Sequence, residues 1–437
     1  MKDKKLKIVV IGAGSASFGL STLSDFFQSP LMRNAELVLC DINEEKLNLM
    51  SELAKRLKET VNFQCKITST TDYKTSIDGA DFVITSVEKR RIESWKKDWE
   101  IPQKFGVKQV LGENGGPGGM FHAFRTIPIL LDIAKSMEEK CPNAWLINFS
   151  NPLHCNMLAI YRYSKIKAIG LCHGLRGVLY QLSDVMGVPY ESLSAIAGGF
   201  NHFTWILELR FKENNKDAYP LLKEKLSQLP HPPQPLSYLL FQKLGLYPSP
   251  GDNHIGEYLP NSLVEECYPW EETRDTFWRF NFEGDEEGRK RLNSLINKII
   301  AGEESPSVLL QHRSGERAID IVEAIVEDKR EFEIAVNIPN KGFIDNLPDG
   351  IVEVPTVVGR DGPEGLNIGK LPRAIASLCQ RQMDIQELIV ESAVTGSRKL
   401  AIQALLIDPV IPNARTAELV FDALYEAHSD LLPTFAP

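Results

Sequence analysis

Hydrophobic residues in the first half of the chain recur as short, nearly continuous runs, with amphipathic stretches between them. These runs lie at 6–12, 36–41, 66–70, 81–87, 145–150 and 167–172. The first closes on a glycine and is rich in β-branched residues, which is typical of a buried parallel strand. Residues 44–57, by contrast, carry apolar side chains at helical intervals. This alternation predicts an α/β fold with a doubly wound parallel sheet and helices on both faces.

The pattern changes after residue 190. Residues 192–211 indicate two antiparallel strands around a Gly-Gly-Phe-Asn break, and 331–339 and 350–358 indicate further strands. Long helical patterns occupy 284–302, 316–328, 371–396 and 414–428. We therefore expect two domains, a dinucleotide-binding domain over 1–190 and a mixed α+β domain over 191–437. The second is expected to hold substrate and metal and to carry the oligomer contacts.

Composition and charge narrow the function classes. The chain has 437 residues, of which 43% are hydrophobic and 24% charged, so a disordered or low-complexity protein is excluded. A net charge of −9 gives no basic footprint for nucleic acid. No stretch approaches the roughly 20 apolar residues of a membrane span. Seven scattered cysteines without a CxxC motif indicate a reducing compartment, so we expect a cytoplasmic protein.

A glycine-rich turn follows the first predicted strand and opens the first helix. It reads Gly12-Ala13-Gly14-Ser15-Ala16-Ser17-Phe18, so a serine stands at the third glycine position of the usual fingerprint. Such a turn lets the backbone approach a pyrophosphate at a helix N-terminus. Asp41 ends the second predicted strand, where a carboxylate binds the ribose diol and disfavours a 2′-phosphate. The sequence predicts a Rossmann-type NAD site, to which we assign Gly12, Gly14, Ser15, Ser17, Phe18, Asp41 and Asn148.

Asn151 and Pro152 follow the fifth predicted strand, at the edge of the sheet where ligands bind. Lactate and malate dehydrogenases place a similar Asn-Pro here, beside the nicotinamide. Their carboxylate-clamping arginine and His-Asp pair do not appear at the required spacing. Two other features stand out: Cys172 at a strand end and His202 in the glycine-rich turn. Both can reach one metal ion, and each taken alone also fits a structural residue.

Taken together, these segments resemble glycoside hydrolase family 4, the NAD- and divalent-metal-dependent glycosidases. The resemblance spans most of the chain and rests on the order and spacing of its motifs. They are IGAGSASFG, GENGGPGG followed by TIP, NFSNP, LCHG, GGFNHFTW, PSPGDNHIGEYLP and NIPNKGFIDNLPDGIVEVP. The family departs from the usual two-carboxylate glycosidases. It implies oxidation of the sugar at C3, loss of the C2 proton, elimination of the aglycone and addition of water.

The resemblance also implies roles for individual residues. Cys172 and His202 fall on the metal ligands, and Mn²⁺ is expected on resemblance alone, because Cys and His by themselves favour zinc. Other divalent metals are possible. Asp252 matches the base that removes the C2 proton. Glu113 falls where many members carry Asp and is the expected general acid.

Three residues are expected to contact substrate: Asn151 near the metal, His173 beside Cys172, and Arg125, which either binds substrate or serves packing. We expect the glycine-rich segment 111–119 to be a mobile lid over the site.

The expected activity is that of an α-glycosidase, a hydrolase of carbohydrate metabolism. The Cys172-His173 pair is similar to branches of the family that act on unphosphorylated sugars. We expect an α-uronide substrate first, and an α-galactoside or α-glucoside otherwise. Arg176 either pairs with a C6 carboxylate or is an ordinary surface residue of a helix, and the second interpretation is slightly favoured. A homodimer or homotetramer is expected. Two alternatives stay open, an NAD-dependent 2-hydroxy-acid dehydrogenase and a non-catalytic dinucleotide sensor.

Overall fold

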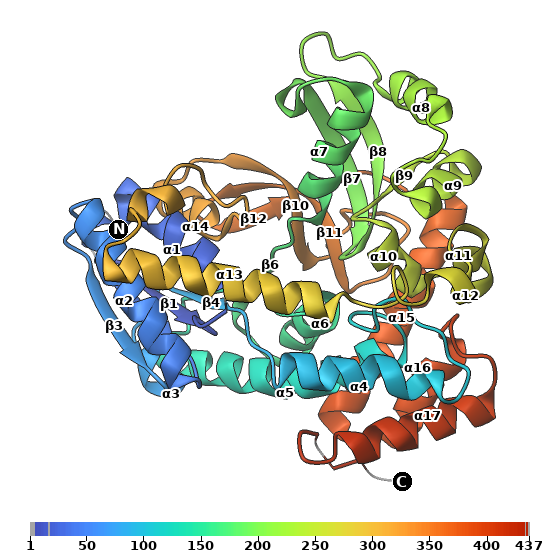
Figure 1. Ribbon diagram of the computed structural model, residues 1–437, viewed down its shortest axis with the longest axis horizontal. Coiled ribbons are helices and arrows are strands. Elements are labelled where there is room, and N and C mark those ends of the chain that lie inside the picture. Colours follow the sequence, from blue (N-terminus) through green and yellow to red (C-terminus); the bar gives the residue numbers. More distant parts are fainter. Residues whose placement is uncertain (1–4, 16–17, 433, 436–437) are drawn as a thin grey trace.

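A single twelve-stranded sheet runs through the molecule, in the order β3-β2-β1-β4-β5-β6-β10-β11-β7-β8-β9, with β12 paired to β11. The computed structural model describes residues 5–15, 18–432 and 434–435. The first six strands in that order are mutually parallel, and the pairs beyond β6 are antiparallel. Figure 1 shows the parallel half on the left and the strands β7 and β8 at the upper right. The order 3-2-1-4-5-6 confirms the predicted doubly wound sheet.

The strands are β1 (Lys7–Ile11), β2 (Glu36–Cys40), β3 (Lys66–Thr70), β4 (Phe82–Thr85), β5 (Trp145–Asn148), β6 (Lys167–Gly170), β7 (Leu193–Phe200), β8 (Phe203–Phe211), β9 (Tyr247–Ser249), β10 (Glu331–Pro339), β11 (Ile351–Gly359) and β12 (Gly362–Gly365). The parallel strands β4, β5 and β6 end two residues earlier than their hydrophobic runs. The residues that follow them leave the sheet and form the crevice at its carboxyl edge.

The helices of the first half are α1 (Phe18–Gln28), α2 (Glu44–Thr60), α3 (Tyr73–Ser76), α4 (Arg91–Gln103), α5 (Gly116–Lys140), α6 (Leu153–Tyr163) and α7 (Gly174–Met186). Those of the second half are α8 (Tyr219–Gln228), α9 (Pro235–Leu244), α10 (Asp252–Ile255), α11 (Asn261–Cys267), α12 (Trp270–Thr273), α13 (Phe282–Ala301), α14 (Ala318–Glu327), α15 (Arg373–Thr395), α16 (Arg398–Ile407) and α17 (Ala414–Ala427). The 3₁₀ helices of the described residues are η1 (Pro30–Asn34), η2 (Tyr190–Ser192), η3 (Gly256–Tyr258) and η4 (Pro306–Leu309). None of the helices in these described residues is long and apolar enough to cross a membrane.

Helices cover both faces of the parallel half. Alternate residues of β1 enter different cores, with Ile8 and Val10 on one side and Val9 and Ile11 on the other. The helices α1, α2, α13 and α14 cover the first face, and α5 and α6 cover the second. A strand buried on both faces needs a continuous apolar run, which is why the sequence pattern located it.

The second half of the chain is tied closely to the first. Its strands extend the same sheet, α14 packs against α1, and α15 packs against α5 and α6. Figure 1 shows α15, α16 and α17 grouped beside α4 and α5 at the lower right. The proposed division into 1–190 and 191–437 stays a prediction.

The parallel and antiparallel parts of the sheet meet at sparse pairings. Residue Asn337 of β10 pairs with Gly170 of β6, and Glu353 of β11 pairs with Gly199 of β7. The carboxylate of Glu353 accepts hydrogen bonds from Asn337, Asn201 and Thr204. Within this buried polar seam, Gly170 lies two residues before Cys172, and Asn201 lies directly before His202. The seam therefore fixes the two predicted metal ligands relative to each other.

Candidate active site

The glycine turn after β1 is built for close backbone approach. Gly12 has φ +85°, and a side chain there would meet the Ser86 carbonyl oxygen at 2.0 Å. A side chain at Gly14 would meet the Asp41 carboxylate at 2.8 Å. A side chain at Gly19, in the first turn of α1, would meet the Ala13 carbonyl oxygen at 2.3 Å, so a glycine there lets the helix pack closely against the turn, as the third glycine of the fingerprint normally does. The sequence analysis assigned that position to Ser17, which lies outside the described residues.

Asp41 lies over this turn, at the end of β2. Its carboxylate accepts hydrogen bonds from the backbone N–H of Gly14 and of Asn43, both at 2.8 Å. The next residue, Ile42, is 86% exposed, which is unusual for a large apolar side chain. The carboxylate of Asp41 can accept hydrogen bonds from a ribose. The exposed side chain of Ile42 can provide an apolar surface for an adenine ring. Ile42 was missed by the sequence analysis, although its place after the strand-terminal acid was a usable signal.

A pocket of about 150 Å³ opens at the carboxyl edge of β5 and β6. Its walls come from the first residue of α1, the segments after β5 and β6, the β7–β8 turn and the start of α10. The lining residues are Phe18, Phe149, Asn151, Leu153, Leu171, Cys172, His173, Gly174, His202, Pro250 and His254. Five predicted site residues, namely Phe18, Asn151, Cys172, His173 and His202, therefore meet in one cavity.

Cys172 and His202 face each other in this pocket. The Cys172 Sγ atom lies 3.4 Å from His202 Nε2. Bond lengths of about 2.3 Å to sulfur and 2.0 Å to nitrogen place two ligands of one zinc-like ion about 3.1 to 3.6 Å apart. The spacing therefore fits a shared cation. His202 also adopts φ +64°, a conformation that a non-glycine residue keeps only where its surroundings enforce it.

Burial sets the protonation of both groups. It raises the pKa of the Cys172 thiol to about 12, with the nearby Glu353 carboxylate adding to the effect. It lowers the pKa of His202 well below its usual value, so the imidazole stays neutral and free to ligate. A cation would favour the thiolate that burial otherwise suppresses. No group of three or more His, Cys, Asp or Glu side chains within the described ranges could enclose a metal, so the remaining positions fall to water or substrate oxygens.

Glu113 reaches the edge of the same pocket, where Asn151 binds it. The Asn151 Nδ2 group donates to Glu113 Oε1 at 3.1 Å, and Asn114 Nδ2 donates to Glu113 Oε2 at 3.1 Å. The Arg91 guanidinium is 3.9 Å from the same carboxylate. The predicted general acid and a predicted substrate contact are thus joined directly.

The segment around Glu113 differs from the expected mobile lid. Residues 109–127 are buried throughout, and α5 starts at Gly116. The Glu257 carboxylate accepts hydrogen bonds from the backbone N–H of Glu113, Asn114 and Gly115. The prediction of a lid was wrong because the glycines serve close packing: a side chain at Gly118 would meet the Gly112 carbonyl at 2.5 Å.

Glu257 and His254 complete this side of the site. Glu257 is 2% exposed, and burial raises its pKa to about 8, with the neighbouring Glu113 carboxylate adding to the rise. The His254 ring lies 4.2 Å from the His202 ring. His254 Nδ1 and Glu257 Oε2 are 4.0 Å apart, and within the described structure neither atom has a hydrogen-bond partner. The sequence analysis did not assign a role to either residue.

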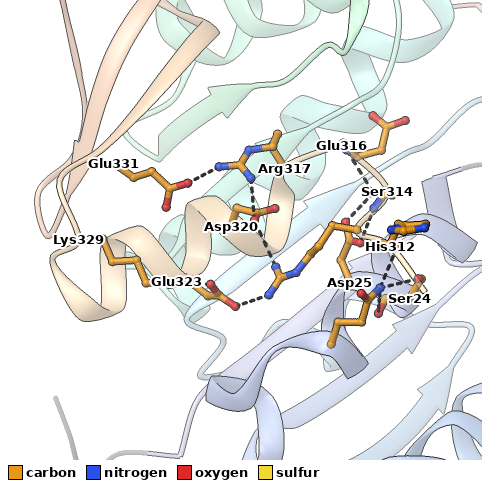
Figure 2. Close-up of polar contacts among 12 residues, drawn as sticks. Ser24, Asp25, His312, Ser314, Glu316, Arg317, Asp320, Glu323, Lys329 and Glu331 are labelled. Carbon is orange, nitrogen blue, oxygen red and sulfur yellow. Dashed lines mark hydrogen bonds and ion pairs between the residues drawn. The ribbon is translucent and has the colours of Figure 1, made fainter. Parts of the chain in front are cut away.

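His173 is held from the opposite side by the loop that precedes α14. Its Nδ1 atom lies 3.2 Å from Glu316 Oε1, and this carboxylate raises the pKa of His173. Figure 2 shows how the loop is fixed: Ser314 donates to the buried Asp25 of α1, and Arg317 pairs with Asp320 of α14. The helix that follows the glycine turn is therefore linked to a wall of the pocket.

Asp252 has a different environment from the one predicted for a base. It is 1% exposed and is not among the residues that line the pocket. Its carboxylate accepts hydrogen bonds from Leu236 N, Ser237 N, Ser237 Oγ and Tyr268 Oη, at 2.5 to 2.8 Å. It therefore caps the N-terminus of α9.

Two further assignments are also corrected by the structure. The Arg125 guanidinium is buried and pairs with Asp98, which also binds His428 Nε2, so it is a core ion pair rather than a substrate contact. The Asn148 side chain bonds to Thr85 and Ser150 and holds the ends of β4 and β5 together rather than facing a cofactor.

Comparisons with known proteins agree with this arrangement. Residues 7–188 match the family 4 glycosyl hydrolases, and residues 197–411 match the C-terminal domain of that family. An α-glucosidase of Erwinia rhapontici is 34% identical over 96% of this chain and 97% of its own length. An α-galactosidase of Bacillus subtilis (strain 168) is 31% identical over 98% and 99%. A 6-phospho-α-glucosidase from gut microorganisms, solved in complex with NAD and Mn²⁺, superimposes with a TM-score of 0.85 at 22% identity, covering 99% of this chain and 100% of that one.

The environment of Asp252 generates a first prediction. In Asp252→Asn, an amide group replaces one acceptor oxygen and faces backbone N–H donors of α9. We expect the free energy of unfolding to fall by about 1–3 kcal/mol, measured by thermal and urea unfolding. An Asp252→Asn protein that keeps wild-type stability and loses only turnover would instead support the base assignment.

Glu257 generates a second prediction, on the pH dependence of stability. Its folded pKa of about 8 lies above the ordinary value of 4.5, so between these pH values the folded protein keeps a proton that the unfolded chain has lost. Stability should therefore fall as pH rises through this window, by up to about 1.4 kcal/mol per pH unit from this group. Glu257→Gln removes the titrating group, and we expect its unfolding free energy to fall less steeply than that of the wild type over the same window. Parallel curves for the two proteins would contradict the prediction.

Proposed function

The chain belongs to family 4 of the glycosyl hydrolases, and from this premise we propose that it is an NAD- and divalent-metal-dependent α-glycosidase for neutral, unphosphorylated sugars. Family membership makes the protein a glycosidase and replaces the dehydrogenase and sensor alternatives. The observation that carries the finer proposal is the pocket itself, which unites the Cys172–His202 pair with Asn151 at the carboxyl edge of the parallel sheet. Asn151 in turn donates a hydrogen bond to Glu113.

The residues present fit both cofactors. Gly12, Gly14 and Asp41 form a cradle for a dinucleotide that larger side chains would fill. Cys172 and His202 would hold the metal. Bound there, NAD supplies hydride transfer at C3 of the sugar and the divalent ion supplies polarisation of the C2 and C3 oxygens. The relative solved with NAD and Mn²⁺ supports this choice of cofactors.

Charge in the pocket favours a neutral sugar. Among the described residues that line the pocket there is no lysine or arginine. The lining residues that can carry a positive charge are histidines. A 6-phosphate or a C6 carboxylate would normally be met by a guanidinium or an ammonium group. Arg176, which suggested an α-uronide substrate, pairs with Glu333 at 3.0 Å, and Glu333 also binds Arg317. The names of the two sequence relatives, α-glucosidase and α-galactosidase, support the same choice.

Glu113 is proposed as the proton donor to the leaving oxygen. The Asn151 amide fixes its Oε1 atom at the pocket edge, and its Oε2 atom is held by Asn114. A buried carboxyl group beside the bond that breaks contributes about 10²- to 10⁴-fold when the leaving group is poor. Asn151 itself lines the pocket and has a second role in orienting the sugar hydroxyls.

A substrate panel tests the sugar class. With added NAD and Mn²⁺, we expect p-nitrophenyl α-glucoside or α-galactoside to give a kcat/KM at least about tenfold above that of the α-galacturonide and of 6-phosphorylated substrates, because no lysine or arginine in the described lining pairs with their charge. Activity should disappear after removal of NAD or treatment with a chelator and return when each is restored. A clear preference for a charged substrate would refute the neutral-sugar assignment and leave the family intact.

The proposed elimination route is tested by hydrolysis in D₂O. Loss of the C2 proton before the glycosidic bond breaks should leave deuterium at C2 of the released sugar, as read by NMR or mass spectrometry. Direct displacement at C1 never breaks the C2–H bond, so an unlabelled C2 in the product of active enzyme would rule out elimination. NADH absorbance should stay constant during turnover, because the cofactor is regenerated in each cycle.

A further inference from the structure

Glu257 is a buried acid that the mechanism above does not use. It lies in η3, 2% exposed, and its Oε1 atom accepts three consecutive backbone N–H groups. The distances are 2.7 Å from Glu113, 3.0 Å from Asn114 and 3.3 Å from Gly115. One carboxylate oxygen thus fixes the backbone that carries the proposed acid.

The helix η3 packs closely against the backbone of residues 113–115. A side chain at Gly115 would meet the Glu257 carbonyl oxygen at 2.5 Å. The Glu113 side chain in turn spans from this segment to Asn151 in the pocket wall, at 3.1 Å. A shift of the 113–115 backbone would therefore move the Glu113 carboxyl group away from the pocket, and displacements near 1 Å are costly to catalysis.

The second oxygen of Glu257 points to the other side of the pocket. Glu257 Oε2 lies 4.0 Å from His254 Nδ1, and both atoms are buried without a hydrogen-bond partner in the described structure. His254 lines the pocket and contacts the ring of His202. Glu257 therefore stands between two walls of the site, the Glu113 segment and His254, while it lines neither the pocket nor the metal position.

We propose that Glu257 is a positioning residue, which sets Glu113 at the distance from the leaving oxygen that proton donation requires. This inference rests on the proposed role of Glu113 as general acid. A residue that only stabilised the segment before α5 would make the same backbone contacts, so the test must separate loss of stability from loss of proton donation.

The dependence of kcat on the leaving group separates loss of proton donation from loss of stability. An aryl leaving group such as 2,4-dinitrophenolate departs without a proton, whereas methanol needs one. For Glu257→Ala, we expect kcat on the methyl α-glycoside to fall by about 100-fold, and kcat on the dinitrophenyl α-glycoside by less than about 5-fold, with KM nearly unchanged for both. Glu257→Gln keeps an acceptor oxygen for the three N–H groups, and we expect it to restore most of the loss.

Three comparisons complete the experiment. Glu113→Gln should show the same leaving-group pattern, and the double variant Glu113→Gln/Glu257→Ala should lose no more than Glu113→Gln alone, because both changes act on one step.

Asp408→Asn is the matched control: this buried carboxylate also accepts a backbone N–H at the start of α5, from Gly116, but it approaches from the C-terminal helices. It should leave the ratio of the two rates unchanged. Folding of each variant is verified by its melting temperature and by NAD binding.

The outcomes are distinct. A folded Glu257→Ala protein that loses the same factor on both substrates, or none, overturns the positioning role, as does an equal change of the ratio in Asp408→Asn. Absence of leaving-group dependence in Glu113→Gln instead refutes the proposed acid. If Glu257→Ala does not fold, Glu257→Asp, whose shorter side chain cannot span the same contacts, gives the same reading.

Discussion

The buried Glu353 carboxylate is the interaction on which the arrangement of the site depends. It accepts hydrogen bonds from Thr204 at 2.8 Å, Asn337 at 2.9 Å and Asn201 at 3.3 Å, and it is 4% exposed. These donors come from the β7–β8 turn, from β8 and from β10. The strand β10 joins the parallel sheet through one residue pair with β6, and β11 joins β7 through another. Burying a charged group costs free energy unless hydrogen bonds satisfy its lone pairs. The three donors and the Glu353 carboxylate therefore hold one another in place.

The consequence of this seam is the meeting of two distant segments. Cys172 follows β6 and His202 lies in the β7–β8 turn, and without the seam nothing in the local sequence would bring their side chains to 3.4 Å. The seam also sets the electrostatics, because Glu353 adds to the burial that raises the pKa of Cys172. A thiol in this environment is a poor nucleophile and becomes an anion when a cation binds beside it. The pocket therefore favours metal binding by Cys172 over covalent catalysis by its thiol.

The sequence located what local patterns encode and missed what long-range contacts decide. The strands of the parallel half, the glycine turn and Asp41 were located because buried runs and strand ends have local signatures. The pairing of Cys172 with His202 was expected from the family resemblance. Asp252 was expected to act as a base, and its role as a cap was not foreseen, because its partners Leu236 and Ser237 lie 16 and 15 residues upstream, which no motif reveals.

Arg125 was misassigned because its partner, Asp98, lies 27 residues upstream. Glu257 received no role from the sequence, because the backbone that it binds lies 142 to 144 residues upstream. In the glycine-rich segment, composition suggested mobility, while close packing around Glu257 and Gln109 requires the small residues.

Two carboxylates lie beside the segment that leads into α5, and they bind different donors. Glu257 Oε1 accepts the backbone N–H groups of Glu113, Asn114 and Gly115. The Glu113 carboxylate accepts the side-chain amides of Asn114 and Asn151 and lies 3.9 Å from the Arg91 guanidinium. Backbone contacts therefore fix where the segment lies, and side-chain contacts fix how the Glu113 carboxyl group is directed. A general acid has to lie within hydrogen-bond reach of the leaving oxygen, so both sets of contacts support the proposed role of Glu113.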